Sequence, residues 1–249
     1  MYIFLRSTLK PLIQALYRQQ VVGAEQVPAQ QGAILASNHL TFVDSIFLPL
    51  ALDRQIYFLA KSDYFTSPGL KGRLMKWFFT SVGQLPMDRS GGARSAQSLD
   101  LALSSLKEGK LIGIYPEGTR SPDGQLYRAK LGVARLALSA QVPIIPVAQV
   151  GNEKIQRPGS NRIHLWSQGR PIRVTTIFGQ PIDPAPYLDW KDQRAAQREL
   201  ADRVLADIGR LLGQQVQPVY AADVKGLMAS KGLSAAEARA QLLAKPSGS

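Results

Sequence analysis

A chain of 249 residues with 45% hydrophobic and 19% charged residues is long and apolar enough to bury a full core, and these values exclude a disordered chain. The chain has no cysteine, which excludes disulfides, thiolate nucleophiles and cysteine-bound metals, and its two histidines argue against a histidine-rich metal site. The net charge of +12 favours an anionic partner (nucleic acid, an anionic lipid surface or a phosphorylated substrate), although a basic surface also keeps a protein soluble.

Residues 1–18 predict a basic amphipathic helix. Apolar residues recur at helical spacing, Arg6 and Lys10 fall on another side, and Pro11 could bend the helix. Nowhere does the chain contain the roughly 18 consecutive apolar residues that a membrane span needs. A helix of this kind either lies on a membrane surface or packs against the core. We expect residues 1–19 to form a helix at a membrane surface.

Segments with the pattern of strands alternate with segments with the pattern of helices along most of the chain. The expected strands are 32–37, 56–60, 111–115, 144–150 and 172–178, and the expected helices are 42–53, 70–80, 93–107, 128–140 and 189–212. This alternation predicts an α/β fold with a central sheet, mostly parallel or mixed, flanked by helices. A main domain would cover residues 20–213, and residues 214–249 would form a C-terminal helical extension and tail.

His39 follows the apolar run 32–37, at the strand end where α/β sheets present ligands. Asp44 would fall in the first turn of the next helix, within reach of a ring nitrogen of His39. The carboxylate would then fix the tautomer and stabilise the imidazolium, while the other nitrogen takes a proton from a hydroxyl. The same two residues also fit a structural histidine beside a helix-capping aspartate.

A second polar segment, residues 115–121, follows an expected strand and holds the sequence Tyr-Pro-Glu-Gly-Thr-Arg-Ser. Gly118 allows close approach of the backbone, and Arg120 has a guanidinium suited to phosphate. Arg89 lies at another strand-to-helix junction, where backbone amides at a helix start would add to an anion site. Taken singly, each arginine is better explained by a surface ion pair, and Glu117 could orient an arginine, bind a substrate hydroxyl or support the turn.

Together, four segments in this order resemble the glycerolipid acyltransferase family, in its 1-acylglycerol-3-phosphate acyltransferase type, over residues 30–180. The blocks of the family are matched in turn by Asn38-His39-x₄-Asp44, by Asp88-Arg89, by residues 115–121 and by the apolar run Val142–Val147. Two departures occur. Pro86-Met87 replaces the usual apolar-aromatic residues, and Tyr115 replaces phenylalanine.

The resemblance implies that His39 deprotonates the acceptor hydroxyl while Asp44 holds its ring, and that the alkoxide attacks an acyl thioester without a covalent enzyme intermediate. It assigns the binding of the phosphorylated acceptor to Arg89, Glu117, Gly118, Thr119 and Arg120. Val142–Val147 would be mostly structural and would line the apolar wall of the site. No metal and no resident cofactor is implied.

The implied reaction moves a fatty acyl group from acyl-CoA or acyl-carrier protein to the sn-2 hydroxyl of 1-acylglycerol 3-phosphate, a lysophospholipid, forming phosphatidic acid. Residues 20–213 would be the acyltransferase domain, bound peripherally to an anionic surface at the cytoplasmic face of the cell membrane. Three alternatives stay open. The acceptor could be glycerol 3-phosphate or another lipid, water could replace it as in a thioesterase, or the protein could be a non-catalytic basic membrane binder.

Residues 120–180 carry nine Lys or Arg against two Asp or Glu. Binding of single-stranded nucleic acid would require stacking aromatic residues among these charges, and only Tyr127, Trp166 and Phe178 occur there. We therefore expect no nucleic-acid partner. The segment 61–89 places Lys and Arg residues beside the aromatic run 77–79, a composition that suits either a headgroup layer or a protein core.

Overall fold

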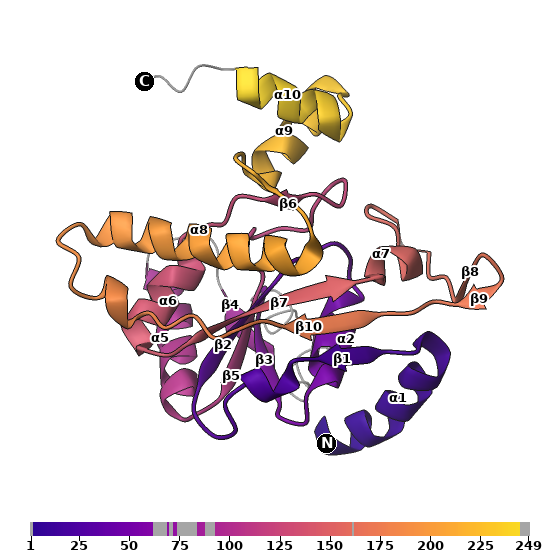
Figure 1. Ribbon diagram of the computed structural model, residues 1–249, viewed down its shortest axis with the longest axis horizontal. Coiled ribbons are helices and arrows are strands. Elements are labelled where there is room, and N and C mark those ends of the chain that lie inside the picture. Colours follow the sequence, from indigo (N-terminus) through magenta and orange to yellow (C-terminus); the bar gives the residue numbers. More distant parts are fainter. Residues whose placement is uncertain are drawn as a thin grey trace.

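The computed structural model describes residues 2–61, 69, 72–73, 84–87, 93–160 and 162–244, and within them a seven-stranded sheet forms the centre of the molecule (Figure 1). Its strands, in the order in which they lie, are β1 (Gln20–Val22), β10 (Thr175–Phe178), β7 (Ile144–Val150), β2 (Ala33–Ser37), β5 (Leu111–Ile114), β3 (Ile56–Lys61) and β4 (Gln84–Met87). All neighbours are parallel except β10 and β7. The predicted α/β fold with a mostly parallel sheet is confirmed.

Strand β2 lies inside the sheet, between β7 and β5, and is buried on both faces. Ile34 and Ala36 belong to the apolar cluster under one helical layer, whereas Ala33 and Leu35 belong to the cluster on the opposite face. Because both faces are covered, the strand reads as a continuous apolar run rather than an alternating one. This burial fixes the end of β2, where His39 follows.

Helices cover both faces of the sheet (Figure 1). Helices α5 (Ala93–Lys107), α6 (Gly132–Ala140) and α8 (Gln193–Leu212) contribute to the first cluster, and α2 (Asp44–Ala51) contributes to the second. Helix α8 begins four residues later than predicted because Asp192 caps it, accepting hydrogen bonds from the backbone amides of Arg194 and Ala195. The predicted helix start at 128 is also too early, because Leu126–Tyr127 form the short strand β6.

Helix α1 (Tyr2–Tyr17) continues through Pro11. Near its end, the ring of Tyr17 packs edge-on against Phe47, with 5.6 Å between the ring centroids, whereas Leu12 is 56% exposed. The two expectations for this helix are therefore compatible: one side packs on the core, and exposed leucines remain available on another. In the described part of the chain, every helix is too short or too polar to cross a membrane.

The C-terminal extension docks beside the segment 115–121. Strand β11 (Val216–Gln217) pairs with β6, and helices α9 (Ala221–Lys231) and α10 (Ala235–Ala244) enclose the buried ring of Tyr127. The remaining short elements are η1 (Ala24–Gln26), α7 (Asn152–Ile155), β8 (Trp166–Ser167), β9 (Arg170–Pro171) and η2 (Ala185–Tyr187). Strand β4 is followed along the chain by helix α5, which confirms the strand-to-helix junction that was predicted around Arg89. Arg89 itself, Asp88, most of the predicted helix 70–80 and the aromatic run 77–79 lie outside the described residues.

Candidate active site

His39 and Asp44 meet in the turn between β2 and α2. Helix α2 begins at Asp44, and the carboxylate folds back so that its Oδ2 lies 3.0 Å from the Nδ1 atom of His39. A carboxylate only accepts hydrogen bonds, so the ring donates from Nδ1 and leaves Nε2 as an acceptor. Asp44 is fully buried, and the histidine side chain keeps 17% of its surface exposed. The predicted contact is confirmed, and one ring nitrogen is available to a ligand.

The turn holds the Asp44 carboxylate in a single orientation. Its Oδ2 accepts hydrogen bonds from the backbone amides of Leu40 (2.6 Å) and Thr41 (2.7 Å), and its Oδ1 accepts from the hydroxyl of Thr41 (3.2 Å). The amide of Asn152, at the start of α7, donates a further bond of 2.8 Å to Oδ1. All these donors lie before the helix or in another element, so Asp44 is not acting as a helix cap. This geometry excludes the capping part of the structural interpretation.

A buried amide network supports the turn from β7. Asn38 bonds the backbone of Gln149 twice, through its amide nitrogen (3.1 Å) and its amide oxygen (2.8 Å). The Gln149 side chain in turn donates to Ser37 and accepts from Asn152. Each of these side chains is buried, and unsatisfied polar groups are costly there, so the network strongly disfavours other arrangements.

The imidazole of His39 stacks on the ring of Tyr115, with 3.8 Å between the ring centroids and 11° between the planes. Tyr115 stacks in turn on Phe58, and its hydroxyl lies 3.0 Å from Ser45 Oγ at the start of α2. Burial raises the pKa of the Tyr115 phenol well above its ordinary value, so the hydroxyl stays protonated. The residue that departs from the family pattern therefore keeps the stacking role of a ring and adds a hydrogen bond.

Glu117 joins the two predicted segments. It is 1% exposed, and its carboxyl accepts hydrogen bonds from the backbone amides of His39 (3.4 Å) and Tyr127 (2.9 Å). Burial raises the pKa of Glu117 to about 8, against an ordinary value of 4.5, although the two amides act in the opposite direction. Near neutral pH this carboxyl is mostly protonated and can donate a hydrogen bond.

The residues after Glu117 form a half-buried loop that presents the exposed Arg120. Gly118 has φ of +75°, a backbone conformation that favours glycine. A Cβ at this position would also lie only 3.0 Å from the Lys130 side chain. Thr119 accepts a 3.1 Å hydrogen bond from Lys225 of α9, and Arg120 is exposed. Burial and the neighbouring Arg120 charge lower the pKa of Lys225. Cations this close together repel, and such an arrangement suits an anion that would relieve the repulsion.

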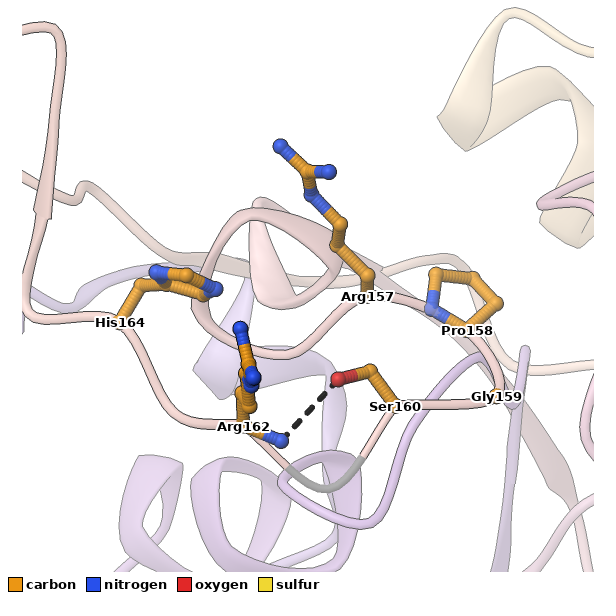
Figure 2. A pocket seen from close by; sticks show the side chains of 6 residues that line it. All are labelled: Arg157, Pro158, Gly159, Ser160, Arg162 and His164. Carbon is orange, nitrogen blue, oxygen red and sulfur yellow. Dashed lines mark hydrogen bonds between the residues drawn. The ribbon is translucent and has the colours of Figure 1, made fainter.

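Two hollows lie on the described surface. The smaller, of about 220 Å³, is lined by Asn38, Leu40, Glu117 and Gln149, among others, and extends to Leu212 at the end of α8. The larger, of about 540 Å³, lies over residues 157–164 and includes neither His39 nor Glu117 (Figure 2). The smaller hollow therefore adjoins the predicted site. In the fourth predicted segment, Ile144, Ile145 and Val147 are buried in the sheet, and Gln149 and Val150 line the hollow instead, because they lie at the end of β7.

The structure brings His39, Asp44 and Glu117 together and places Gly118, Thr119 and Arg120 directly after them. Sequence reasoning missed Asn152, Gln149 and Lys225. Asn152 follows the end of the apolar strand 144–150, which is the same signal that singled out His39. Lys225 had no local signal, because only the docking of the C-terminal extension brings it to Thr119.

Comparison with known proteins gives one family. A family model described as "Acyltransferase" matches residues 18–150. The chain is 28% identical over 220 residues to a 1-acyl-sn-glycerol-3-phosphate acyltransferase of Bacillus subtilis, an alignment covering 86% of this chain and 100% of the relative. It is 29% identical over 172 residues to a chloroplastic protein of the same description from Brassica napus, covering 69% of this chain and 48% of the relative.

A chloroplastic relative from Arabidopsis thaliana, of the same description, is 30% identical over 172 residues, covering 69% of this chain and 47% of the relative. The chain thus spans about half the length of the two plant relatives. A solved structure, a 1-acyl-sn-glycerophosphate acyltransferase from Thermotoga maritima, aligns with a TM-score of 0.57 and 23% identity over 84% of this chain and 82% of the other. That likeness supports the fold.

Proposed function

This chain belongs to the acyltransferase family, and on that premise we propose that it transfers a fatty acyl group from an acyl thioester to the sn-2 hydroxyl of 1-acylglycerol 3-phosphate, forming phosphatidic acid. The observation that carries the proposal is the 3.0 Å contact between His39 Nδ1 and Asp44 Oδ2, beside a basic loop that follows Glu117. A base and an anion site next to each other are what acylation of a phosphorylated alcohol requires.

In the proposed reaction His39 Nε2 removes the proton from the acceptor hydroxyl, and the resulting oxygen attacks the thioester carbonyl. The new carbon–oxygen bond forms as the carbon–sulfur bond breaks, and the proton passes from Nε2 to the departing thiolate. Asp44 stabilises the imidazolium between these steps and keeps Nε2 directed outward. No covalent enzyme intermediate and no metal ion takes part.

The acceptor phosphate binds to Arg120 and Lys225, with Arg89 as a further ligand. Two guanidinium groups and an ammonium supply the charge that a phosphate monoester needs, and the backbone at Gly118 gives it room to approach. Glu117, protonated near neutral pH, donates a hydrogen bond to a glycerol oxygen. The loop Gly118-Thr119-Arg120 thus selects the phosphorylated acceptor, while His39 reacts with its hydroxyl.

The acyl donor in this proposal is acyl-CoA or acyl-carrier protein, used as a substrate, and the protein works at an anionic membrane surface as a peripheral enzyme on the cytoplasmic face. Support for membrane contact comes from α1, where Leu12 and Leu16 are 56% and 39% exposed although Tyr17 on the same helix is buried. Exposed leucines on an amphipathic helix are suited to the boundary between headgroups and acyl chains.

The test is acyl transfer by the purified protein. Acyl-CoA should release free thiol only when 1-acylglycerol 3-phosphate is present, and labelled acyl chains should appear in phosphatidic acid. Equal thiol release without an acceptor would instead establish a thioesterase. A panel containing glycerol 3-phosphate and lysolipids with other headgroups decides between acceptors, and transfer to none of them would overturn the proposal.

A further inference from the structure

Residues 157–160 and 162–173 belong to a loop and hairpin that extend away from the α/β domain at the right-hand end of Figure 1. Strands β8 and β9 pair only through Trp166 with Pro171 and Ser167 with Arg170, and the two residues between them, Gln168 and Gly169, both have positive φ. This is a tight turn with little structure to support it. Every residue from 162 to 170 is exposed, and the stretch 157–173 contains four arginines and no carboxylate.

Three basic side chains surround the larger hollow. Its lining includes Arg157, Arg162 and His164, whose side chains all project to the same side of the loop in Figure 2. The backbone beneath them is tied down: Arg162 N donates to Ser160 Oγ (3.1 Å), and His164 N donates to the carbonyl of Ile155 (2.8 Å). Across the described part of the chain, no ion pair joins Arg157 or Arg162 to a carboxylate. These cations are therefore available to an external anion.

Large apolar side chains lie next to Arg162 and His164 along the chain. Ile163, Leu165 and Trp166 are 52%, 44% and 61% exposed. Soluble proteins expose single apolar residues routinely, but three within four positions, beside arginines that form no ion pair with a described carboxylate, make a patch. The interfacial layer of a bilayer suits both kinds of group, because phosphates attract the cations and the acyl boundary accepts indole and aliphatic side chains.

Buried contacts join the base of this patch to α1 and to the catalytic turn. Ile172 and Val174, directly after the hairpin, pack in one apolar cluster with Tyr17 of α1 and Phe47 of α2. Gln156 joins the loop to the turn: it donates to the carbonyl of Ser160 (2.8 Å) and accepts from the amide of Phe42 (2.9 Å). Phe42, three residues after His39, is itself 59% exposed. A surface touching α1 and the hairpin would thus lie beside the catalytic turn.

We propose that Arg157, Arg162 and His164 bind the phosphate headgroups of anionic phospholipids in a bilayer, while Ile163, Leu165 and Trp166 insert at the bilayer surface. We call these six residues the hairpin surface. The proposal rests on the proposed action on a membrane lipid and adds a second membrane contact to that of α1. Two contacts fix the orientation of the molecule, so that the turn at His39 faces the layer in which the lysolipid acceptor lies.

The first experiment is co-sedimentation with vesicles of phosphatidylcholine, with and without phosphatidylglycerol. The double variant Arg157→Ala/Arg162→Ala should bind phosphatidylglycerol vesicles about 10- to 30-fold more weakly, from about 1 kcal/mol for each arginine near an anionic surface. The matched control is Arg135→Ala/Arg194→Ala, which removes the same charge from exposed positions on α6 and at the start of α8, at the opposite end of Figure 1. Equal loss in both double variants would reduce the effect to net charge and overturn the proposal.

The second experiment measures insertion. In a Trp77→Phe background, which leaves Trp166 and Trp190 as the two tryptophans, brominated phosphatidylglycerol should quench the fluorescence. Adding Trp166→Phe should abolish that quenching, and adding Trp190→Phe should retain it. Unchanged quenching after the Trp166→Phe substitution would show that the hairpin does not insert into the bilayer and would overturn the proposal. A further arm adds inorganic phosphate to vesicle-bound protein. Release beyond that caused by chloride at equal ionic strength would identify a site for free phosphate instead.

Acyl transfer to a short-chain, monomerically dissolved 1-acylglycerol 3-phosphate separates this proposal from the proposed function. The Arg157→Ala/Arg162→Ala variant should keep the wild-type rate with the dissolved acceptor and lose rate only with acceptor presented in vesicles. If the wild type transfers no acyl group at all, the proposed function fails while the vesicle measurements still decide on the hairpin surface. If Arg157→Ala/Arg162→Ala and Trp166→Phe both behave as the wild type with vesicles, the proposal for the hairpin surface is wrong and the proposed function is unaffected.

Discussion

Asp44 and Arg120 lie in the two halves of the candidate site and are held in opposite ways. Asp44 is fully buried and receives hydrogen bonds from two backbone amides, a hydroxyl, an amide side chain and the His39 ring. Arg120 is exposed, and within the described residues its guanidinium makes no hydrogen bond. Its neighbour Thr119 is bonded by Lys225, from an extension outside the family match.

The difference fits the role that the proposed function gives to each half. A general base acts only within a narrow range of distance and angle, so its orientation must be fixed before the substrate arrives. A phosphate carries its charge on several oxygens and tolerates movement of its ligands. Substitutions in the His39–Asp44 half should therefore lower kcat, and substitutions in the Arg120–Lys225 half should raise the acceptor KM.

The largest expected effect is that of His39→Ala. Loss of the general base should lower kcat by at least about 10²- to 10⁴-fold. The melting temperature should also fall, because the substitution removes a hydrogen bond from the buried Asp44 carboxylate, so kcat is measured at a temperature where the variant is folded. Steady-state kinetics with a dissolved short-chain acceptor measure it. His164→Ala, at the other histidine of the chain, is the control and should retain the wild-type kcat. Turnover of His39→Ala close to that of the wild type would reject the base assignment.

Asn152→Ala tests whether the buried network serves the catalytic half alone. The substitution removes the 2.8 Å hydrogen bond to Asp44 Oδ1, and such bonds to charged groups contribute roughly 1.5–3 kcal/mol. If that contribution orients the base, kcat should fall about 10- to 100-fold with the acceptor KM unchanged.

A purely structural Asn152 would predict a different result, in which the urea midpoint falls and kcat of the remaining folded protein is unaffected. Measuring both quantities on the same preparation separates the two roles. If Asn152→Ala instead raised the acceptor KM and left kcat normal, the two halves of the site would not divide catalysis and phosphate binding in the way described above.

The contrast also explains what the sequence could predict. The run at 33–37 and all of the run at 144–150 except Val150 are buried, so their apolar character identified the strands, and the polar residues after β2 identified the turn. The strand pairs β6–β11 and β8–β9 are two residues long and carry no periodicity. Lys225 reaches Thr119 through packing of α9 around Tyr127, a contact between residues 106 positions apart. Long-range docking of that kind leaves no local pattern.

Glu117 connects the halves, and Glu117→Gln tests its protonation. Its folded pKa of about 8 lies above the ordinary 4.5, so the stability that it contributes is fully present below about pH 4.5 and is lost as the pH rises through 8. Between pH 5 and 8 the urea midpoint of the wild type should fall more than that of the glutamine variant. Glu199→Gln, at an exposed position of α8, should keep the wild-type slope. Parallel slopes for wild type and Glu117→Gln would show that this carboxyl is ionised throughout.

Lys225→Ala should have the smallest effect on the kinetics, and it is the most direct test of phosphate binding by the Arg120–Lys225 half. An ammonium that is only partly buried is partly screened by water, so its loss should raise the acceptor KM only several-fold, from about 1 kcal/mol, and leave kcat unchanged.

Lys231→Ala, exposed at the end of the same helix, is the matched control, and Lys225→Arg should restore most of the affinity. The same variants assayed with a monoacylglycerol, which lacks the phosphate, should be indistinguishable from the wild type, because the charge then has nothing to bind. A fall in kcat with that neutral acceptor would mean that Lys225 holds the loop in place, and the C-terminal extension would then belong with the rigid half of the site.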